Sequence, residues 1–165
     1  MSTLSKRQDA VKPRGDGRSS TAEALSELVV HVFRLNGLLT AAGDEMAAPA
    51  NQTSARWRVL AAIEDTPLTV PQIARAWWLT RQSVQRVADA LVEDGFAVYE
   101  DNPGHRRSNL VRIAPRGRSA LRTIRAAQRT WAEGLGAEIG EADLRAANAI
   151  LGRVVELMAR RGPAR

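Results

Sequence analysis

The sequence predicts a mainly α-helical fold that carries one two-stranded β-hairpin. Three observations predict it. Apolar residues recur at helical spacing along long segments near both ends of the chain. Two short helical segments, each preceded by a threonine, follow one another between residues 69 and 95. Two short alternating segments then flank an Asn-Pro-Gly turn, which indicates a hairpin.

Composition limits the class of protein. A chain of 165 residues forms one domain or one compact subunit. Its net charge is +6, with 22 Arg against 2 Lys, which favours an acidic partner. The absence of cysteine excludes disulfides, thiolate zinc sites and a cysteine-based redox sensor. No stretch of about 18 apolar residues and no apolar run after Lys6-Arg7 occur, so we expect a cytoplasmic protein without a membrane span.

The N-terminal part divides into an arm and a helix. Residues 1–20 are polar and basic and are expected to form a disordered arm. A long helix should follow over residues 21–47, capped by Ser20 or Thr21. Its apolar face is wider than one small lobe needs. This face includes Leu25, Leu28 and Val32.

The next helix is expected over residues 53–65. Trp57 lies on its apolar side. A tryptophan there either packs in a core or lines a cleft for a small molecule, and the sequence leaves both open.

The first of the two short helices should begin at Thr69, because its hydroxyl and Gln72 form a capping-box pattern. Ile73, Ala74 and Trp77 give it an apolar stripe. Thr80 caps the second short helix, which Gly95 ends. The residues of this second helix that are expected to face inward are Val84, Val87, Ala88 and Leu91.

That burial leaves polar residues exposed near the start of the second helix. They are Thr80, Arg81, Gln82, Ser83, Gln85 and Arg86. Arginine makes paired hydrogen bonds to guanine and glutamine does so to adenine, while serine and a helix N-terminus suit phosphate oxygens. The pattern is typical of a helix that reads the DNA major groove. An ordinary solvated helix face is the alternative.

The hairpin pairs residues 96–100 with residues 109–113. Its turn contains Asn102-Pro103-Gly104 and continues into His105, Arg106 and Arg107. A basic hairpin beside such a helix favours insertion into a neighbouring minor groove. Glu100 and Asp101 are placed to brace these arginines, and the alternative is a surface salt-bridge cluster of little energetic value.

Two further helices are expected after Pro115, with a break near Gly140. The last of them, residues 141–160, keeps apolar residues at helical spacing. Among these are Leu151, Val155 and Met158.

The central stretch resembles the winged helix-turn-helix of the MarR family of bacterial transcription regulators. The residues that carry the resemblance are Leu79-Thr80-Arg81-Gln82-Ser83-Val84-Gln85-Arg86, Leu91, Gly95 and Asn102-Pro103-Gly104-His105-Arg106-Arg107-Ser108-Asn109-Leu110-Val111. The resemblance implies one subunit over residues 21–165. Residues 52–113 would bind double-stranded DNA, and residues 21–47 and 115–161 would form a homodimer.

The resemblance also implies roles for individual residues. Leu25, Leu28, Val32, Leu151, Val155 and Met158 would lie in the dimer interface. The protein would act as a repressor that a small aromatic or amphipathic ligand releases from a pseudo-palindromic operator, with His31 and Trp57 as candidate ligand contacts.

The sequence offers little for catalysis. The two histidines, His31 and His105, belong to distant segments, so a two-histidine metal site is not expected. We find no nucleophile with a base and no phosphate-binding glycine loop, and expect neither an enzyme nor a cofactor. Two alternatives to the regulated repressor remain: a ligand-independent DNA-binding protein of the same fold, and a protein-interaction or RNA-binding module on a degenerate helix-turn-helix.

Overall fold

The computed structural model describes residues 19–104 and 108–161. The chain forms two compact units, Met1–Leu39 and Thr40–Arg165. Most of the expected N-terminal arm, residues 1–18, lies outside the described residues, and so does the tip of the hairpin with His105, Arg106 and Arg107.

Helix α1, Ser20–Ala47, makes up the described part of the first unit and extends into the second. The hydroxyl of Ser19 accepts a hydrogen bond from the Ala22 N–H at 3.3 Å, so Ser19 is the capping residue instead of the predicted Ser20 or Thr21. Within the first unit the apolar side chains of α1 are largely solvent-exposed, and Phe33 reaches 73%. A single helix cannot bury such residues by itself.

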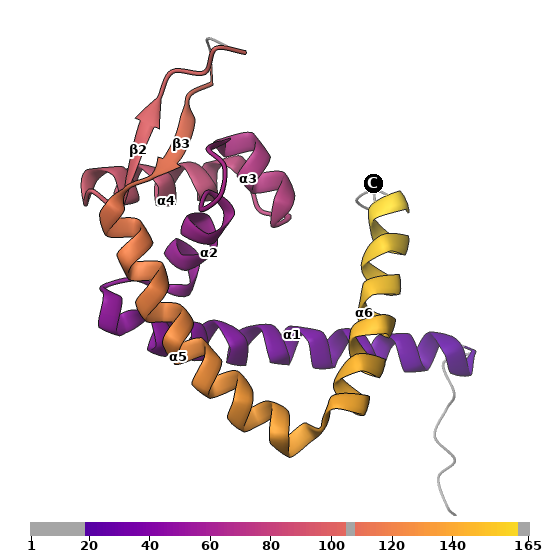
Figure 1. Cartoon of the computed structure of the whole chain (residues 1–165). Helices are drawn as coiled ribbons and strands as arrows, with labels where there is room; N and C mark the ends of the chain where they lie inside the picture. The colour runs from indigo at the N-terminus through magenta and orange to yellow at the C-terminus, as the bar shows by residue number, and fades with distance from the viewer. Residues whose placement is uncertain (1–18, 105–107, 162–165) are drawn as a thin grey trace, which may run out of the picture. The chain divides into compact units, whose positions relative to one another are not determined.

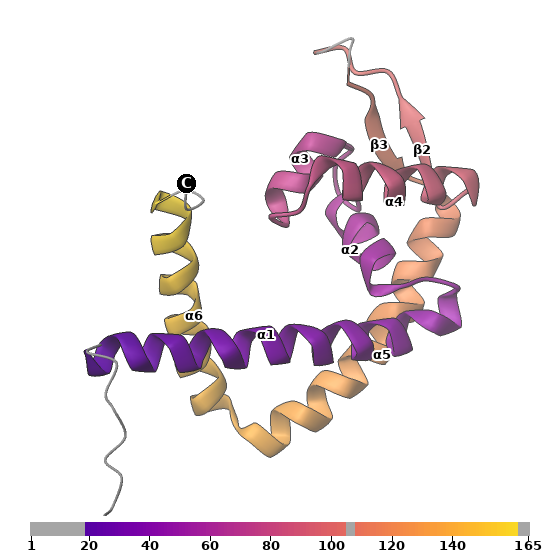
Figure 2. The same cartoon turned by 180° about the vertical axis from the view of Figure 1, so that it is seen from behind.

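The second unit contains the remaining elements (Figures 1 and 2). In chain order they are η1 (Ala48–Ala50), α2 (Ser54–Ala62), β1 (Leu68–Thr69), α3 (Val70–Ala76), α4 (Arg81–Glu93), β2 (Ala97–Glu100), β3 (Leu110–Ile113), α5 (Pro115–Ile139) and α6 (Glu141–Arg161). The long helices and the hairpin match the expected order. Helix α2 ends three residues before the predicted residue 65, with Ile63 as its C-cap, and the Ile63 side chain is buried.

The sheet is antiparallel and has three strands in the order β1-β3-β2. The predicted hairpin is present as the wing strands β2 and β3, each of which begins one residue later than expected, with Tyr99 opposite Val111. Strand β1 was not expected. It consists of two residues that pair with β3, Leu68 opposite Val111 and Thr69 opposite Leu110, and so short a segment shows no alternation in the sequence.

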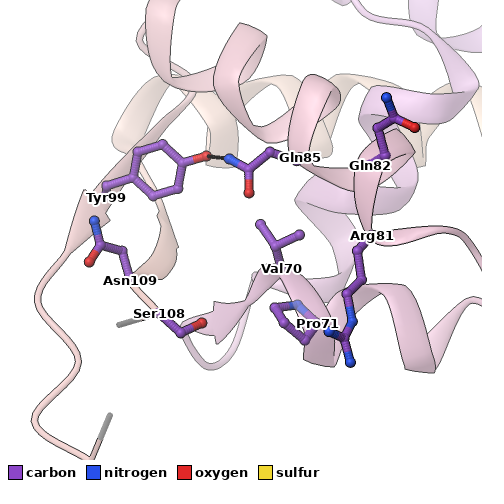
Figure 3. A pocket seen from close by; sticks show the side chains of 8 residues that line it. All are labelled: Val70, Pro71, Arg81, Gln82, Gln85, Tyr99, Ser108 and Asn109. Atoms are coloured by element: carbon purple, nitrogen blue, oxygen red, sulfur yellow. Dashed lines mark hydrogen bonds between the residues drawn. The ribbon is translucent and has the colours of Figure 1, made fainter. Parts of the chain in front are cut away.

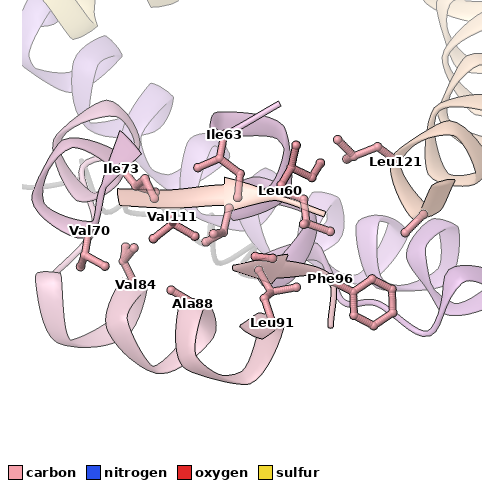
Figure 4. Close-up of a cluster of buried hydrophobic side chains, with 14 of the residues drawn as sticks. Leu60, Ile63, Val70, Ile73, Val84, Ala88, Leu91, Phe96, Val111 and Leu121 are labelled. Carbon is pink, nitrogen blue, oxygen red and sulfur yellow. The ribbon is translucent and has the colours of Figure 1, made fainter. Parts of the chain in front are cut away.

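The core lies between α2, α3, α4, the start of α5 and one face of the sheet (Figure 4). Val84, Ala88 and Leu91 project from α4 into it at helical spacing, as predicted. Ala97 and Val111 face the core from β2 and β3. The burial therefore fixes both the rotation of α4 and the side of the wing that faces it.

The turn between α3 and α4 departs from the expectation. Trp77, predicted as part of the apolar stripe of α3, is 43% exposed, and Trp78 is 71% exposed. Helix α3 ends at Ala76, and Trp77 is its C-cap. Trp78 adopts a left-handed conformation with φ 53°, which is uncommon for a large residue.

Gly117 in α5 gives a test of this packing. A Cβ at residue 117 would overlap the Phe96 carbonyl oxygen and lie 2.8 Å from Ile113 Cγ1. We expect Gly117→Ala to lower the free energy of unfolding by about 1–3 kcal/mol or more. Urea denaturation followed by circular dichroism measures the change.

Gly134→Ala in the same helix is the matched control. A Cβ there meets nothing within 4 Å, so the gain in helix propensity should raise the free energy of unfolding by about 0.5–1 kcal/mol. Equal stability of the two variants would contradict the close approach of α5 to the sheet.

Candidate nucleic-acid interface

Helix α4 begins as predicted. Thr80 is its N-cap, and the Thr80 hydroxyl accepts a hydrogen bond from the Ser83 N–H at 3.1 Å. The first turn contains no acidic residue, so the partial positive charge of the helix N-terminus is not offset by a neighbouring carboxylate of that turn. The helix start can therefore attract an anion.

The predicted DNA-contacting residues of α4 lie on its outer side. Arg81, Gln82, Gln85 and Arg86 are exposed, while Ser83 is half-buried. The Thr80 hydroxyl accepts the hydrogen bond of the cap. The contacts predicted for His105, Arg106 and Arg107 lie outside the described residues.

A groove of about 570 Å³ runs between α4 and the wing (Figure 3). Three of the predicted residues, Arg81, Gln82 and Gln85, line it, whereas Ser83 and Arg86 do not. The other lining residues come from the start of α3, from β2 and from the segment before β3: Val70, Pro71, Tyr99, Ser108 and Asn109. The groove thus joins α4 and the wing in one surface that contains both polar and apolar side chains.

One wall of the groove carries a network that sequence reasoning missed. Gln85 Nε2 donates to Asp89 Oδ1 and to the Tyr99 hydroxyl, each at 2.8 Å, and the Tyr99 hydroxyl donates to Asp89 Oδ1 at 2.6 Å. The i,i+4 spacing of Gln85 and Asp89 is a signal that the sequence contains. The contribution of Tyr99 depends on the packing of β2 against α4 and has no local signal.

The opposite end of α4 is held by two arginines. Arg56 Nη2 in α2 forms an ion pair with Asp94 Oδ2 at 2.6 Å, and Arg116 Nη1 in α5 donates to the Asp94 carbonyl oxygen at 2.8 Å. Both guanidinium groups also lie over the Phe96 ring, at 5.3 and 4.3 Å from its centroid. Positive charge suits the C-terminal end of a helix, so these contacts stabilise the position of α4.

The described part of the wing is held by an ion pair between its strands and by the side chain of Asn102. Glu100 forms an ion pair with Arg112 diagonally across β2 and β3, and its predicted partners Arg106 and Arg107 lie outside the described residues. Asn102 shapes the turn, because its side chain donates to the Ser108 carbonyl oxygen and accepts from the Gly104 N–H, both at 3.0 Å.

The candidate ligand contacts are in different surroundings. His31 is exposed on α1. Trp57 is half-buried and packs against the core, which is the first of the two alternatives that the sequence left open. Among the described residues, no group of three or more His, Asp and Glu side chains is arranged to hold a metal ion. No helix in residues 19–104 and 108–161 is long and apolar enough to cross a membrane.

The three short helices, the sheet and the exposed face of α4 define a winged helix-turn-helix DNA-binding protein. The sequence model of the MarR family matches residues 52–108, which include α2 to β2 and the turn of the wing. Uncharacterised proteins from Mycobacterium bovis and Mycobacterium tuberculosis are 45% identical to this chain over 103 residues, 62% of this chain and 72% of theirs.

Solved structures give the same result. Staphylococcus aureus MarR in complex with salicylate and kanamycin has a TM-score of 0.70 at 14% identity, covering 86% of this chain and 95% of that one, and so supports the fold. The transcriptional repressor CouR bound to a 23-mer DNA duplex has a TM-score of 0.69 at 25% identity, covering 79% of this chain and 94% of CouR. The chain belongs to the MarR family. It is a DNA-binding transcription regulator and not an enzyme.

Tyr99 allows the network beside α4 to be tested directly, because it is the single tyrosine of the chain. Burial, followed by the hydrogen bond to Asp89 and the negative charge of Asp89, raises the pKa of Tyr99 from 10.0 to about 12, against a smaller lowering effect of the hydrogen bond from Gln85. The raised pKa means that Tyr99 contributes stability fully below pH 10.0, and that this contribution is lost as the pH rises through about 12.

We expect phenolate absorbance after rapid pH jumps to titrate near pH 12 in the folded protein. Asp89→Asn should lower this midpoint part of the way towards 10.0, since burial, the largest cause, remains. Asp65→Asn, an exposed change outside the network, should leave it unaltered. A midpoint of 10.0 in the folded wild type would contradict the network.

Proposed function

We propose that the chain is a homodimeric repressor that reads a pseudo-palindromic operator through α4 and the wing, and that a small aromatic or amphipathic ligand releases it. Each subunit would place Arg81, Gln82, Ser83, Gln85 and Arg86 in a major groove, with Thr80 capping the helix that presents them. His105, Arg106 and Arg107 would reach the adjacent minor groove or the backbone.

The observation that carries the proposal is the exposed polar face of α4. Its opposite face is buried, and its two ends are held by the Thr80 cap and by the contacts of Arg56 and Arg116. A helix held in this way presents Arg81, Gln82, Gln85 and Arg86 in a fixed arrangement. These side chains carry the donors and acceptors that base edges match in the major groove.

The dimer is supported by unburied apolar side chains on the terminal helices. In α1, Leu25 and Val32 are exposed and Leu28 is half-buried. In α6, Val155 is 57% and Met158 67% exposed, and Leu151 is half-buried. Apolar residues exposed in such numbers indicate a protein interface. A second copy of the chain would give two α4 helices and hence half-sites about 10 bp apart.

Repression and ligand release rest on likeness to known proteins. CouR is described as a repressor, and the S. aureus protein is described in complex with salicylate. Here Trp57 and His31 are the proposed ligand contacts. A ligand shifts the dimer away from DNA by binding the DNA-incompetent arrangement more tightly than the competent one. A ligand-independent repressor of the same fold would show no thermal stabilisation by salicylate.

Arg86→Ala tests base reading. Binding-site selection from random duplex DNA should give an inverted repeat for the wild type. On that site Arg86→Ala should cost about 1–3 kcal/mol, because the paired hydrogen bonds of the guanidinium to a base are lost. Fluorescence anisotropy with the selected and a scrambled duplex measures the cost.

Arg122→Ala is the matched control, since it removes the same charge from an exposed position on α5. It should weaken binding to both duplexes alike and by less. An equal loss for Arg86→Ala on selected and scrambled DNA would show that Arg86 does not read bases.

Val155→Glu tests the dimer. A carboxylate in an apolar interface loses its hydration, so the variant should sediment as a monomer and bind the inverted repeat weakly. Arg153→Glu, on the opposite side of α6, should sediment and bind like the wild-type dimer. If the Val155→Glu variant sediments as an intact dimer, this face of α6 does not lie in the dimer interface.

A further inference from the structure

Gln85 and Tyr99 line the groove and form a hydrogen-bond network with Asp89. Three hydrogens take part in the network: two from the Gln85 amide and one from the Tyr99 hydroxyl. The amide hydrogens go to Asp89 Oδ1 and the Tyr99 oxygen, and the hydroxyl hydrogen goes to Asp89 Oδ1. Asp89 Oδ1 accepts two of these hydrogens and the Tyr99 oxygen accepts the third, so the donors of Gln85 are directed at partners within the protein.

The orientation of the Gln85 amide follows from the same chemistry. An ionised carboxylate only accepts hydrogen bonds. Turning the amide over would set its carbonyl oxygen against Asp89 Oδ1, acceptor against acceptor. Asp89 therefore holds the NH₂ group inward and leaves the carbonyl oxygen as the group that Gln85 can offer to a ligand.

This carbonyl oxygen points into the groove, away from Tyr99 (Figure 3). Gln85 itself is exposed and lies one helical turn after Arg81 and Gln82, on the outer side of α4. A duplex that meets this side of α4 would meet Gln85 as an acceptor.

An acceptor of this kind can distinguish the bases by the groups that they present in the major groove. Adenine N6 and cytosine N4 present amino donors there, whereas guanine N7 and O6 and thymine O4 are acceptors. A free glutamine favours adenine, because it uses its donor and its acceptor together. With the donors occupied, the preference for adenine alone becomes a preference for either amino-bearing base.

We propose that Asp89 and Tyr99 are positioning residues that turn Gln85 into an acceptor-only reader, which selects adenine or cytosine and rejects guanine or thymine on the strand it faces. The proposal rests on the proposed function, in which α4 enters the major groove. It assigns Tyr99, a residue of the wing, an effect on base choice without direct contact with a base.

The network is suited to this role because it persists near neutral pH. The Tyr99 hydroxyl, whose pKa is raised to about 12, is protonated at neutral pH and donates to Asp89. The Tyr99 ring packs against the core, so its hydroxyl is fixed relative to α4.

The test uses full-length protein and the duplex that the wild type selects. Gln85→Ala first locates the base pair that Gln85 reads, as the position where its preference disappears. Four duplexes that differ at that position are then titrated with wild type, Tyr99→Phe and Asp89→Ala. We expect the wild type to bind the adenine and cytosine duplexes roughly tenfold more tightly than the guanine and thymine duplexes.

Tyr99→Phe keeps the ring but frees one amide hydrogen of Gln85, and Asp89→Ala removes the acceptor from an exposed helix position. Both variants should reduce, several-fold and at this base pair alone, the tenfold ratio between the affinities for the adenine and cytosine duplexes and those for the guanine and thymine duplexes. The affinity for the adenine duplex should rise relative to that for the cytosine duplex, because the amide donor becomes available. A merely structural role would weaken all four duplexes alike. Gln82→Ala, outside the network, should alter a different position of the site.

The outcomes separate this proposal from the proposed function. If the wild type enriches no sequence, α4 does not read bases, and both the proposed function and the acceptor-only role of Gln85 are overturned. If it enriches a site but prefers guanine or thymine at the Gln85 position, or if Gln85→Ala alters no position, the acceptor-only role alone is overturned. The same follows if the Tyr99 and Asp89 variants keep the four-way ratios of the wild type. Thermal melting confirms that each variant is folded.

Discussion

Burial of one face of α4 is the constraint on which the rest of the structure depends. Val84, Ala88 and Leu91 are spaced by three and four residues, so they share one side of the helix and enter the core together. Removing each of the larger side chains from water contributes about 1.5–3 kcal/mol. With that side fixed, Arg81, Gln82, Gln85 and Arg86 have to face outwards. The packing of the apolar residues of α4 therefore determines the direction in which its polar residues point.

The surroundings of α4 turn this orientation into a defined surface. At one end of the helix, Arg56 and Arg116 bind Asp94 and lie over the Phe96 ring, and at the other end Thr80 is the N-cap. Tyr99 joins β2 to the middle of the helix through a hydroxyl that both accepts and donates. The wing and α4 consequently form one surface. Under the proposed function, a substitution in either one should alter the base preference of the protein.

Local signals explain what the sequence could predict. The Thr69–Gln72 capping box and the Thr80 cap lie within a few residues of their partners, and both were predicted and are present. Strand β1 exists because of its pairing with β3 and was missed. Trp77 was assigned to an apolar face because the end of α3 at Ala76 has no clear local signal. The link between Tyr99 and Asp89 depends on tertiary packing, so no pattern in the sequence indicated it.

Methylation interference on the selected duplex would test the central claim most directly, because dimethyl sulfate modifies guanine N7 in the major groove and adenine N3 in the minor groove. If α4 reads bases as a pair of helices, N7 methylation in each of two half-sites about one helical turn apart should prevent binding, with N3 effects confined to the flanks that the wing reaches. Full affinity for duplexes methylated at every N7 of the site would show that α4 does not enter the major groove.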